Sequence, residues 1–182
     1  GVWACSGPKG QDRRRLRGRS DCWDSPVASP TDNISVTTVY FDYACEDSYR
    51  FQRLLDMAEV SADWRPFSLT QAASKASSWH WTNGEVPLSV LGLAGHEVVK
   101  AQSAPGTKAY RQEMFRLFHD TQHLPKRDQI WQLIEKFTGF PQADLDLDAA
   151  LQRVQDSHEV AASKAVFSTP TVFIEDSDRP FF

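Results

Sequence analysis

The 182-residue sequence lacks several features that would each have pointed to a familiar class of protein. No apolar run approaches the ~18 residues that a membrane-spanning helix requires. No apolar segment follows the basic N-terminal residues, as it would in a secretory signal peptide. The formal net charge is −4, which gives no overall positive field for nucleic acid. We therefore expect a cytoplasmic protein that binds neither membranes nor nucleic acid.

Cysteine is also scarce, with only Cys5, Cys22 and Cys45 in the chain. They form no Cys-x-x-Cys pair and show no zinc-site spacing. Cys5 and Cys22 could form a disulfide, but a reducing compartment disfavours one.

Residues 1–32 differ in composition from the rest of the chain. They contain a basic run at 13–15, then a stretch rich in Pro, Ser and Asp, and show neither helical nor strand periodicity. We expect a disordered tail here, serving either as a basic arm or as a processed or wrongly translated leader. Residues 33–182 are expected to form one folded domain.

The folded part opens with a buried strand that leads into a helix. Residues 34–43 (ISVTTVYFDY) are β-branched and aromatic almost throughout, which is typical of a central strand in an α/β sheet. Residues 48–60 have a helical period, so Cys45 is predicted at the junction between strand and helix. The apolar stripe predicted for this helix comprises Phe51, Leu54, Leu55 and Ala58.

The remaining pattern predicts helices inserted between two further strands. Residues 63–69 indicate a second strand, where Pro66 favours an edge position. A strand–helix–strand unit implies parallel pairing, and 169–174 indicate another strand that begins at a proline. Helical periods cover 88–103, 107–122, 127–138 and 145–165. Residues 179–182 begin a returning strand, so we expect the C-terminal end to be truncated.

Cys45 is the strongest candidate for a reactive group. The unpaired N–H groups and the dipole of a helix N-terminus favour a thiolate, which is the nucleophilic form. Ser48 lies one turn later and could donate a hydrogen bond to that thiolate. Glu46 and Asp47 oppose it by adding negative charge, so a buried, unreactive cysteine is the alternative interpretation.

Three segments together resemble the DsbA-like thioredoxin-fold family, which includes FrnE-type oxidoreductases and 2-hydroxychromene-2-carboxylate isomerases. VYFDYACEDSYR at 39–50 resembles its first strand and redox motif, DWRPFSL at 63–69 its second strand, and KAVFSTPTVFIED at 164–176 its cis-proline strand. The resemblance covers about residues 34–182. It implies an α/β fold, a thioredoxin-like mixed sheet with an inserted all-helical subdomain at about 70–162. The family's C-terminal helix is absent from this sequence.

The resemblance also implies roles for individual residues. Cys45 takes the place of the nucleophile and Ser48 that of the resolving cysteine, which makes this a monothiol CxxS variant. Thr169 and Pro170 take the place of the cis-proline loop, which pairs with the backbone of a bound peptide or thiol.

The implied function is that of an oxidoreductase exchanging thiols and disulfides through a single cysteine. No tightly bound cofactor is expected; glutathione or mycothiol would be a co-substrate, and a small-molecule thiol or a thiol-containing protein the partner. Two alternatives stay open: an isomerase or transferase that uses a thiol cofactor, and a catalytically inactive binding module. The oligomeric state is not indicated.

Other polar residues are expected to be structural rather than metal-binding. His119 and His123 are four residues apart on one helix but lack a nearby third ligand. Asp144, Asp146 and Asp148 lack the glycine and distal glutamate of a calcium loop and more simply cap the following helix.

Aromatic residues outside the motif are also expected to be structural. Trp79, Trp81 and Trp131 could line a pocket beside Cys45, but core packing is the simpler role. His158 lies on an apolar stripe and is expected to be a satisfied core or boundary residue.

Overall fold

The computed structural model describes residues 37–74, 79, 81, 85–121 and 123–174. The chain divides into two units, Gly1–Asp32 and Asn33–Phe182, and every described residue belongs to the second. The expectations for the tail, with Cys5 and Cys22, and for residues 179–182 therefore lie outside the described residues.

A mixed sheet of three described strands forms the centre of the fold. β1 (Thr37–Phe41) pairs in parallel with β2 (Ala62–Pro66) and antiparallel with β3 (Thr171–Phe173), in the order β2-β1-β3. The predicted central strand and parallel pair are both confirmed. Pro66, which has no N–H to donate, lies on an edge strand as expected.

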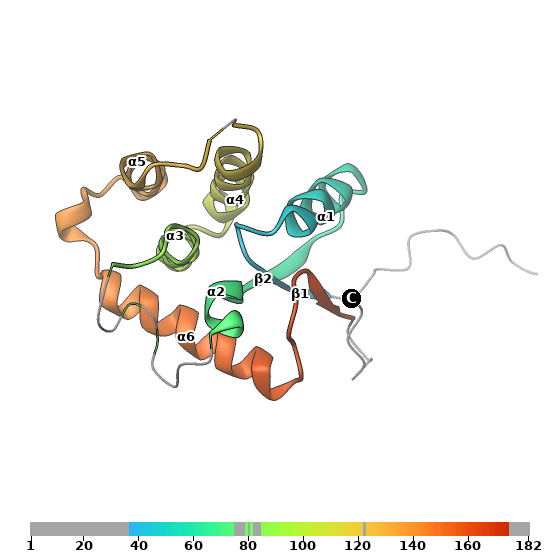
Figure 1. The fold of residues 1–182 in the computed structure, drawn as a ribbon. Helices are drawn as coiled ribbons and strands as arrows, with labels where there is room; N and C mark the ends of the chain where they lie inside the picture. Colours follow the sequence, from blue (N-terminus) through green and yellow to red (C-terminus); the bar gives the residue numbers. More distant parts are fainter. Residues whose placement is uncertain (1–36, 75–78, 80, 82–84, 122, 175–182) are drawn as a thin grey trace, which may run out of the picture. The chain divides into compact units, whose positions relative to one another are not determined.

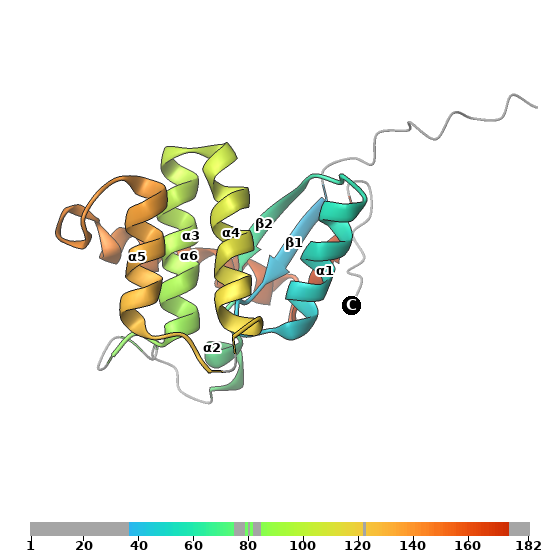
Figure 2. The same ribbon diagram turned by 90° about the horizontal axis from the view of Figure 1, so that it is seen from above.

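The helices α2 to α6 lie between β2 and β3 in the sequence, as predicted. Figures 1 and 2 show α3, α4 and α5 side by side, with α6 crossing beneath α3. The helices are α1 (Glu46–Met57), α2 (Leu69–Ala73), α3 (Leu88–Gln102), α4 (Ala104–His119), α5 (Arg127–Thr138) and α6 (Leu147–Ser163), with a 3₁₀ turn at Gln142–Asp144. None of the described helices is long and apolar enough to cross a membrane.

Side chains alternate across β1 and fill a core on each face of the sheet. Val39 and Phe41 belong to the larger core with α3 and α4, and the fully buried Tyr40 belongs to a smaller cluster with Phe67 and Ala161. This alternation follows from the two-residue period of a strand. Burial on both faces explains the unbroken apolar character of the segment.

The predicted apolar face of α1 is confirmed only in part: Phe51 and Leu55 pack against the larger core, whereas Leu54 and Ala58 are exposed. Leu54 is 60% exposed, whereas Gln52 is only 3% exposed and donates from its amide to Asp56 at 2.6 Å. The buried side of α1 therefore includes Ser48 and Gln52. The prediction from periodicity was incomplete because polar residues lie on the inner side of α1 and a leucine lies on its outer side.

Two predicted helix boundaries are confirmed by their caps. Gly139 follows α5 with φ of +73°, the left-handed conformation that glycine adopts without strain. The Asp146 carboxylate accepts the N–H of Ala149 at 3.0 Å and caps α6.

Candidate active site

A short turn after β1 places Cys45 at the start of α1. Asp42 is fully buried and accepts the N–H of Ala44 at 2.9 Å through one carboxylate oxygen. Its other oxygen accepts the N–H of Leu69 at 2.8 Å, which ties this turn to the segment after β2. The Asp42 carbonyl oxygen accepts the N–H of Cys45 at 3.1 Å. The backbone around Cys45 is thus fixed by one acidic residue.

Cys45 is the N-cap residue of α1, and its sulfur contacts two backbone groups. It accepts the N–H of Ser48 at 3.4 Å and, as a thiol, donates to the carbonyl oxygen of Thr169 at 3.1 Å. The peptide bond between Thr169 and Pro170 is cis. The structure therefore brings together, across 124 positions of sequence, the cysteine and the proline loop that the resemblance pairs. Cys45 is partly exposed, so its sulfur is not enclosed in apolar packing.

Ser48 contacts the sulfur differently from the sequence-based expectation. Its hydroxyl is buried and has no hydrogen-bond partner among the described residues, whereas its backbone N–H makes the contact. The first turn of α1 directs that N–H toward the N-cap, whatever side chain the residue carries. Position 48 contributes to the sulfur through its backbone alone.

The acidic pair beside Cys45 is exposed and partly neutralised. Arg50 pairs with Glu46 at 2.6 Å and lies 3.7 Å from Asp47. Both carboxylates also lie in the first helical turn, where negative charge is favourable to the helix. Arg50 therefore weakens the repulsion that these carboxylates would exert on a thiolate.

Sequence reasoning missed the role of Asp42. Burial raises the pKa of its carboxyl group, and hydrogen bonds from Ala44, Leu69 and Ser89 only partly counteract that effect. Asp42 is the only charged residue in the run at 34–43, and this could have marked it. A buried carboxyl group three residues before a candidate nucleophile both shapes the turn and sets the charge behind it.

His119 holds the same turn from α4. Its Nε2 lies 2.8 Å from the carbonyl oxygen of Tyr43, and its ring stacks on Tyr49 at 5.3 Å. The Tyr49 hydroxyl donates to Asp120 at 2.9 Å. His119 is thus engaged structurally, and the described residues contain no group of three or more potential metal ligands.

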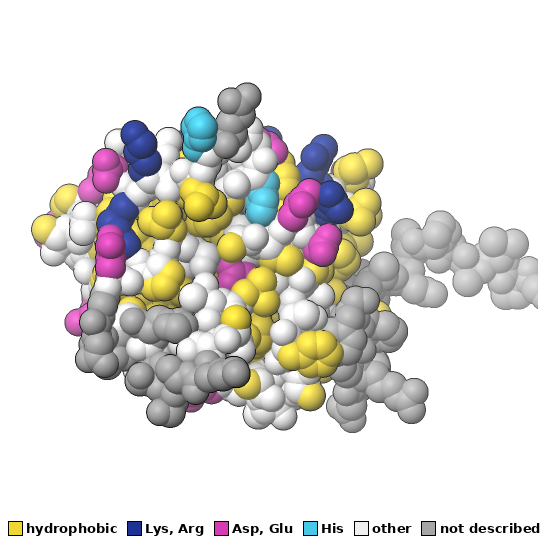
Figure 3. Space-filling view, viewed as in Figure 1, with side chains coloured by type: hydrophobic (Ala, Val, Ile, Leu, Met, Phe, Trp, Pro, Cys, Tyr) yellow, Lys and Arg dark blue, Asp and Glu magenta, His cyan; other side chains and the backbone are white. Residues whose placement is uncertain are grey.

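The surface around this turn is poor in charge at its middle. Figure 3 shows the end of the sheet where β1 stops and α1 begins; hydrophobic and uncharged side chains predominate around its centre, where one acidic side chain is visible, and the other charged side chains lie nearer its upper and left margins. Phe167, two residues before Thr169, is 69% exposed. An extended, largely apolar ligand would find little competing charge here.

No protein-family model matches this chain, and no curated protein sequence matches it. Several solved structures, however, are similar to this chain. A 2-hydroxychromene-2-carboxylate isomerase is 16% identical with a TM-score of 0.60, over 81% of this chain and 88% of that one. MdbA, a thiol-disulfide oxidoreductase from Corynebacterium matruchotii, is 13% identical with a TM-score of 0.58, over 83% and 79%. Reduced DsbA from Mycobacterium tuberculosis is 20% identical with a TM-score of 0.52, over 81% and 74%.

This chain has the DsbA-like thioredoxin fold. The expected mixed sheet with an inserted helical region is therefore confirmed. Within this thioredoxin fold, Cys45 lies at the first helix and Thr169-Pro170 at the entrance to β3.

The remaining aromatic residues of this DsbA-like fold pack as core elements. Trp81 and Trp131 pack against the larger core, and Trp79 lies 4.5 Å from the Trp81 ring and 5.1 Å from that of His158. His158 is buried, stacks on Phe67 at 4.4 Å and accepts the N–H of Ser68 at 3.2 Å. Burial lowers its pKa, so the expectation of a satisfied core residue is confirmed.

Proposed function

We propose that this protein exchanges thiols and disulfides through Cys45 alone, forming a mixed disulfide with a small thiol or a thiol-containing protein. The observation that carries the proposal is the sulfur of the partly exposed residue Cys45, which lies between the Ser48 N–H and the Thr169 carbonyl oxygen. A buried cysteine enclosed by apolar side chains would have argued against it. We place the exchange in the cytoplasm, where small thiols are maintained in reduced form.

The proposed reaction consists of two balanced displacements. The Cys45 thiolate attacks one sulfur of a disulfide R–S–S–R′, so that Cys45–S–S–R forms and R′–S⁻ leaves. A second thiolate, R″–S⁻, then attacks the R sulfur, producing R–S–S–R″ and restoring the Cys45 thiolate. Ser48 has no sulfur, so the second thiolate comes from a co-substrate of the glutathione or mycothiol class.

The groups around the sulfur have complementary roles in these steps. The Ser48 N–H and the α1 N-terminus stabilise negative charge on the attacking or leaving sulfur. In the resting protein, the Thr169 carbonyl oxygen accepts a hydrogen bond from the Cys45 thiol. Once the thiol proton is gone, the same oxygen is available to accept an N–H from the bound ligand, beside Pro170.

Mixed-disulfide formation with oxidised glutathione tests the proposal. The protein carries Cys5→Ser and Cys22→Ser so that Cys45 is the only thiol, and the added mass of one glutathione is followed by mass spectrometry. We expect folded Cys45 to react up to about fivefold faster than the same thiol in urea-unfolded protein, because a helix N-terminus stabilises a negative charge by up to about 1 kcal/mol. The matched control, with Cys45→Ser added, should gain no mass.

Equal rates in the folded and unfolded chain would contradict the proposal and favour an inactive binding module. The release step is tested by adding reduced glutathione, which should restore the original mass. A mixed disulfide that reduced glutathione does not release would contradict turnover through a single cysteine.

An isomerase or transferase that uses a thiol cofactor is the second candidate. The structural likeness to 2-hydroxychromene-2-carboxylate isomerase favours it. In such a reaction the cofactor's sulfur does the chemistry and Cys45 only positions it. Turnover of a glutathione adduct that survives Cys45→Ser would support this candidate over disulfide exchange.

A further inference from the structure

We propose that a second site in this protein binds a small phosphate-type oxyanion. The site is a cavity of about 230 Å³ between the C-terminal part of α1, β2, α3 and α4. None of the candidate active-site residues lines it. The proposal is therefore independent of any chemistry at Cys45.

Arg111 is the central observation. Its side chain lines the cavity from α4, the residue is only 7% exposed, and its guanidinium carbon lies 4.4 Å from the centre of the Trp64 ring. Its Nε is buried and has no hydrogen-bond partner, and the guanidinium forms no ion pair with any described residue. A buried charge without a paired anion is costly. The Trp64 ring and the nearby charge of Asp56 compensate part of that cost, but neither gives Nε a hydrogen-bond acceptor.

The carboxylates that face the cavity are already paired with other cations. Asp56 binds Lys108 at 3.0 Å and also accepts from the Gln112 and Gln52 amides. These contacts lower the pKa of Asp56 even though burial alone would raise it. The surplus charge in this part of the cavity therefore belongs to Arg111.

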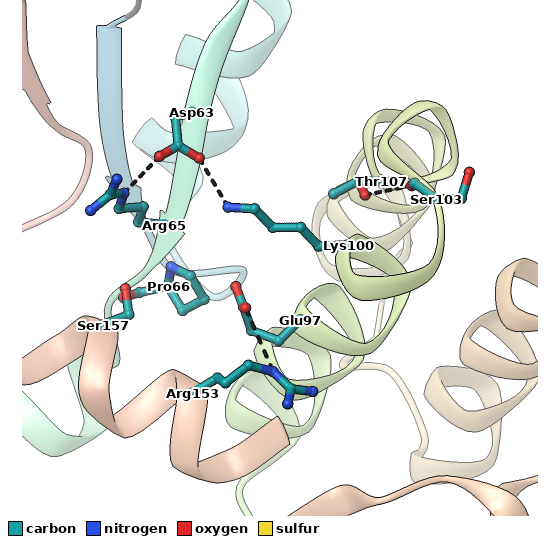
Figure 4. A network of polar contacts seen from close by, with 9 residues as sticks. All are labelled: Asp63, Arg65, Pro66, Glu97, Lys100, Ser103, Thr107, Arg153 and Ser157. Carbon is teal, nitrogen blue, oxygen red and sulfur yellow. Dashed lines mark hydrogen bonds and ion pairs between the residues drawn. The ribbon is translucent and has the colours of Figure 1, made fainter. Parts of the chain in front are cut away.

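The other carboxylate belongs to a neighbouring network of ion pairs. Asp63 binds Lys100 at 2.9 Å and Arg65 at 2.7 Å, and Figure 4 shows both cations directed at it. His96 also lines the cavity, and burial lowers its pKa well below 6.5, so it is neutral at physiological pH. Neither residue offers a negative charge that is free to neutralise Arg111.

Size and charge together identify the class of ligand. The cavity is smaller than the ~300–1,000 Å³ typical of sites for drug-sized molecules, so the ligand is an ion or a short phosphomonoester. A guanidinium presents paired N–H donors that match two oxygens of one phosphate group. Lys100 and Lys108 are paired with Asp63 and Asp56, so the charged residues that line the cavity leave one surplus positive charge, that of Arg111, which favours an oxyanion.

Isothermal titration with inorganic phosphate at neutral pH, against chloride of matched ionic strength, tests the site. We expect saturable binding of one phosphate to the full-length protein. Arg111→Met keeps an apolar side chain against Trp64 and should weaken binding by about 10- to 100-fold, as expected for lost charge-assisted hydrogen bonds. The matched control is Arg116→Met, which removes an exposed arginine from the same helix and should leave the affinity unchanged. Titration with glycerol phosphate in parallel shows whether a free ion or a phosphomonoester binds more tightly.

Absence of saturable binding to the wild-type protein overturns the proposal, as does equal affinity of Arg111→Met and wild type. If Arg111→Met fails to fold, the phosphate titration is repeated with Lys108→Gln. Lys108 is exposed, so this variant should fold, and the loss of its charge should weaken phosphate binding several-fold. Unchanged affinity in that variant overturns the proposal as well.

Discussion

The Asp42 carboxyl group fixes the turn that carries Cys45, and replacing it with asparagine tests this role. Its two oxygens accept different backbone donors, the N–H of Ala44 at 2.9 Å and that of Leu69 at 2.8 Å. Asparagine offers one carbonyl oxygen, so its amide group would face one of these donors. A buried donor left without an acceptor costs about 1–3 kcal/mol. We expect Asp42→Asn to lower the free energy of unfolding by about that amount in mildly acidic solution.

The loss should shrink as the pH rises. Burial raises the pKa of Asp42 above its ordinary value of 3.8 despite the opposing hydrogen bonds. The folded protein therefore holds this proton more strongly than the unfolded chain does. The stability that Asp42 contributes is complete below pH 3.8 and falls as the pH rises through the folded pKa. Asparagine does not titrate, so the difference between the two proteins isolates this group.

Urea unfolding of both proteins at a series of pH values, from about 3.5 to about 8, measures the effect. Asp47→Asn is the matched control, because this neighbouring carboxylate is exposed and its loss should change stability by less than about 0.5 kcal/mol. A stability deficit of Asp42→Asn that grows with rising pH would refute the reasoning. So would a deficit absent at every pH.

Three further perturbations test other parts of the fold. Ser48→Cys, in a chain that also carries Cys5→Ser and Cys22→Ser, should form a disulfide to Cys45 when oxidised glutathione is added as the oxidant and is itself reduced. The disulfide is detected as the loss of two hydrogen atoms by mass spectrometry, and a persistently reduced pair would contradict the assigned motif. Burial lowers the pKa of His158 in the folded protein, so its protonation below pH 6.5 favours unfolding. His158→Met should therefore reduce the slope of unfolding free energy against pH below pH 6.5 by up to about 1.4 kcal/mol per pH unit. An unchanged slope in urea denaturation would contradict this. Gly95→Ala should lower the free energy of unfolding by about 1–3 kcal/mol, since its Cβ would lie 2.2 Å from a buried tyrosine oxygen. Gly106→Ala, whose Cβ would lie 3.3 Å from the Ser103 hydroxyl oxygen, should lower the free energy of unfolding by less than Gly95→Ala does, and equal losses in the two glycine variants would count against the packing argument.

Local pattern was sufficient to predict one half of the candidate site. The buried run through Val39 and Phe41 indicated a central strand, and its abrupt end placed Cys45 at a helix start. A proline at the entrance to a late strand is a weak signal by itself. Its pairing with Cys45 came from the resemblance to the DsbA-like family, because local pattern does not show which distant segments meet.

The missed features depend on tertiary neighbours. Gln52 is buried and donates to Asp56, which also accepts from Gln112 on α4, whereas Leu54 is exposed because nothing described covers that side of α1. Arg111 looks like any polar residue of an amphipathic helix, and only the packed structure shows that its guanidinium lies over Trp64 without a carboxylate partner. Sequence periodicity gives the period of a helix more reliably than its phase when polar residues line the inner face.

The contacts at the sulfur explain how a single thiol can be sufficient at this site. Both of its hydrogen bonds are to backbone atoms, of Ser48 and Thr169, so neither depends on a second reactive side chain. The Ser48 hydroxyl is buried without a partner, so it adds neither charge nor a hydrogen bond to Cys45. In the proposed exchange, the second thiol therefore has to come from outside this motif. It follows that Ser48→Ala should retain the wild-type rate of mixed-disulfide formation within about threefold, since a lost contact worth less than ~0.7 kcal/mol changes a rate by no more than that, and a larger loss would show that the hydroxyl does act on the sulfur.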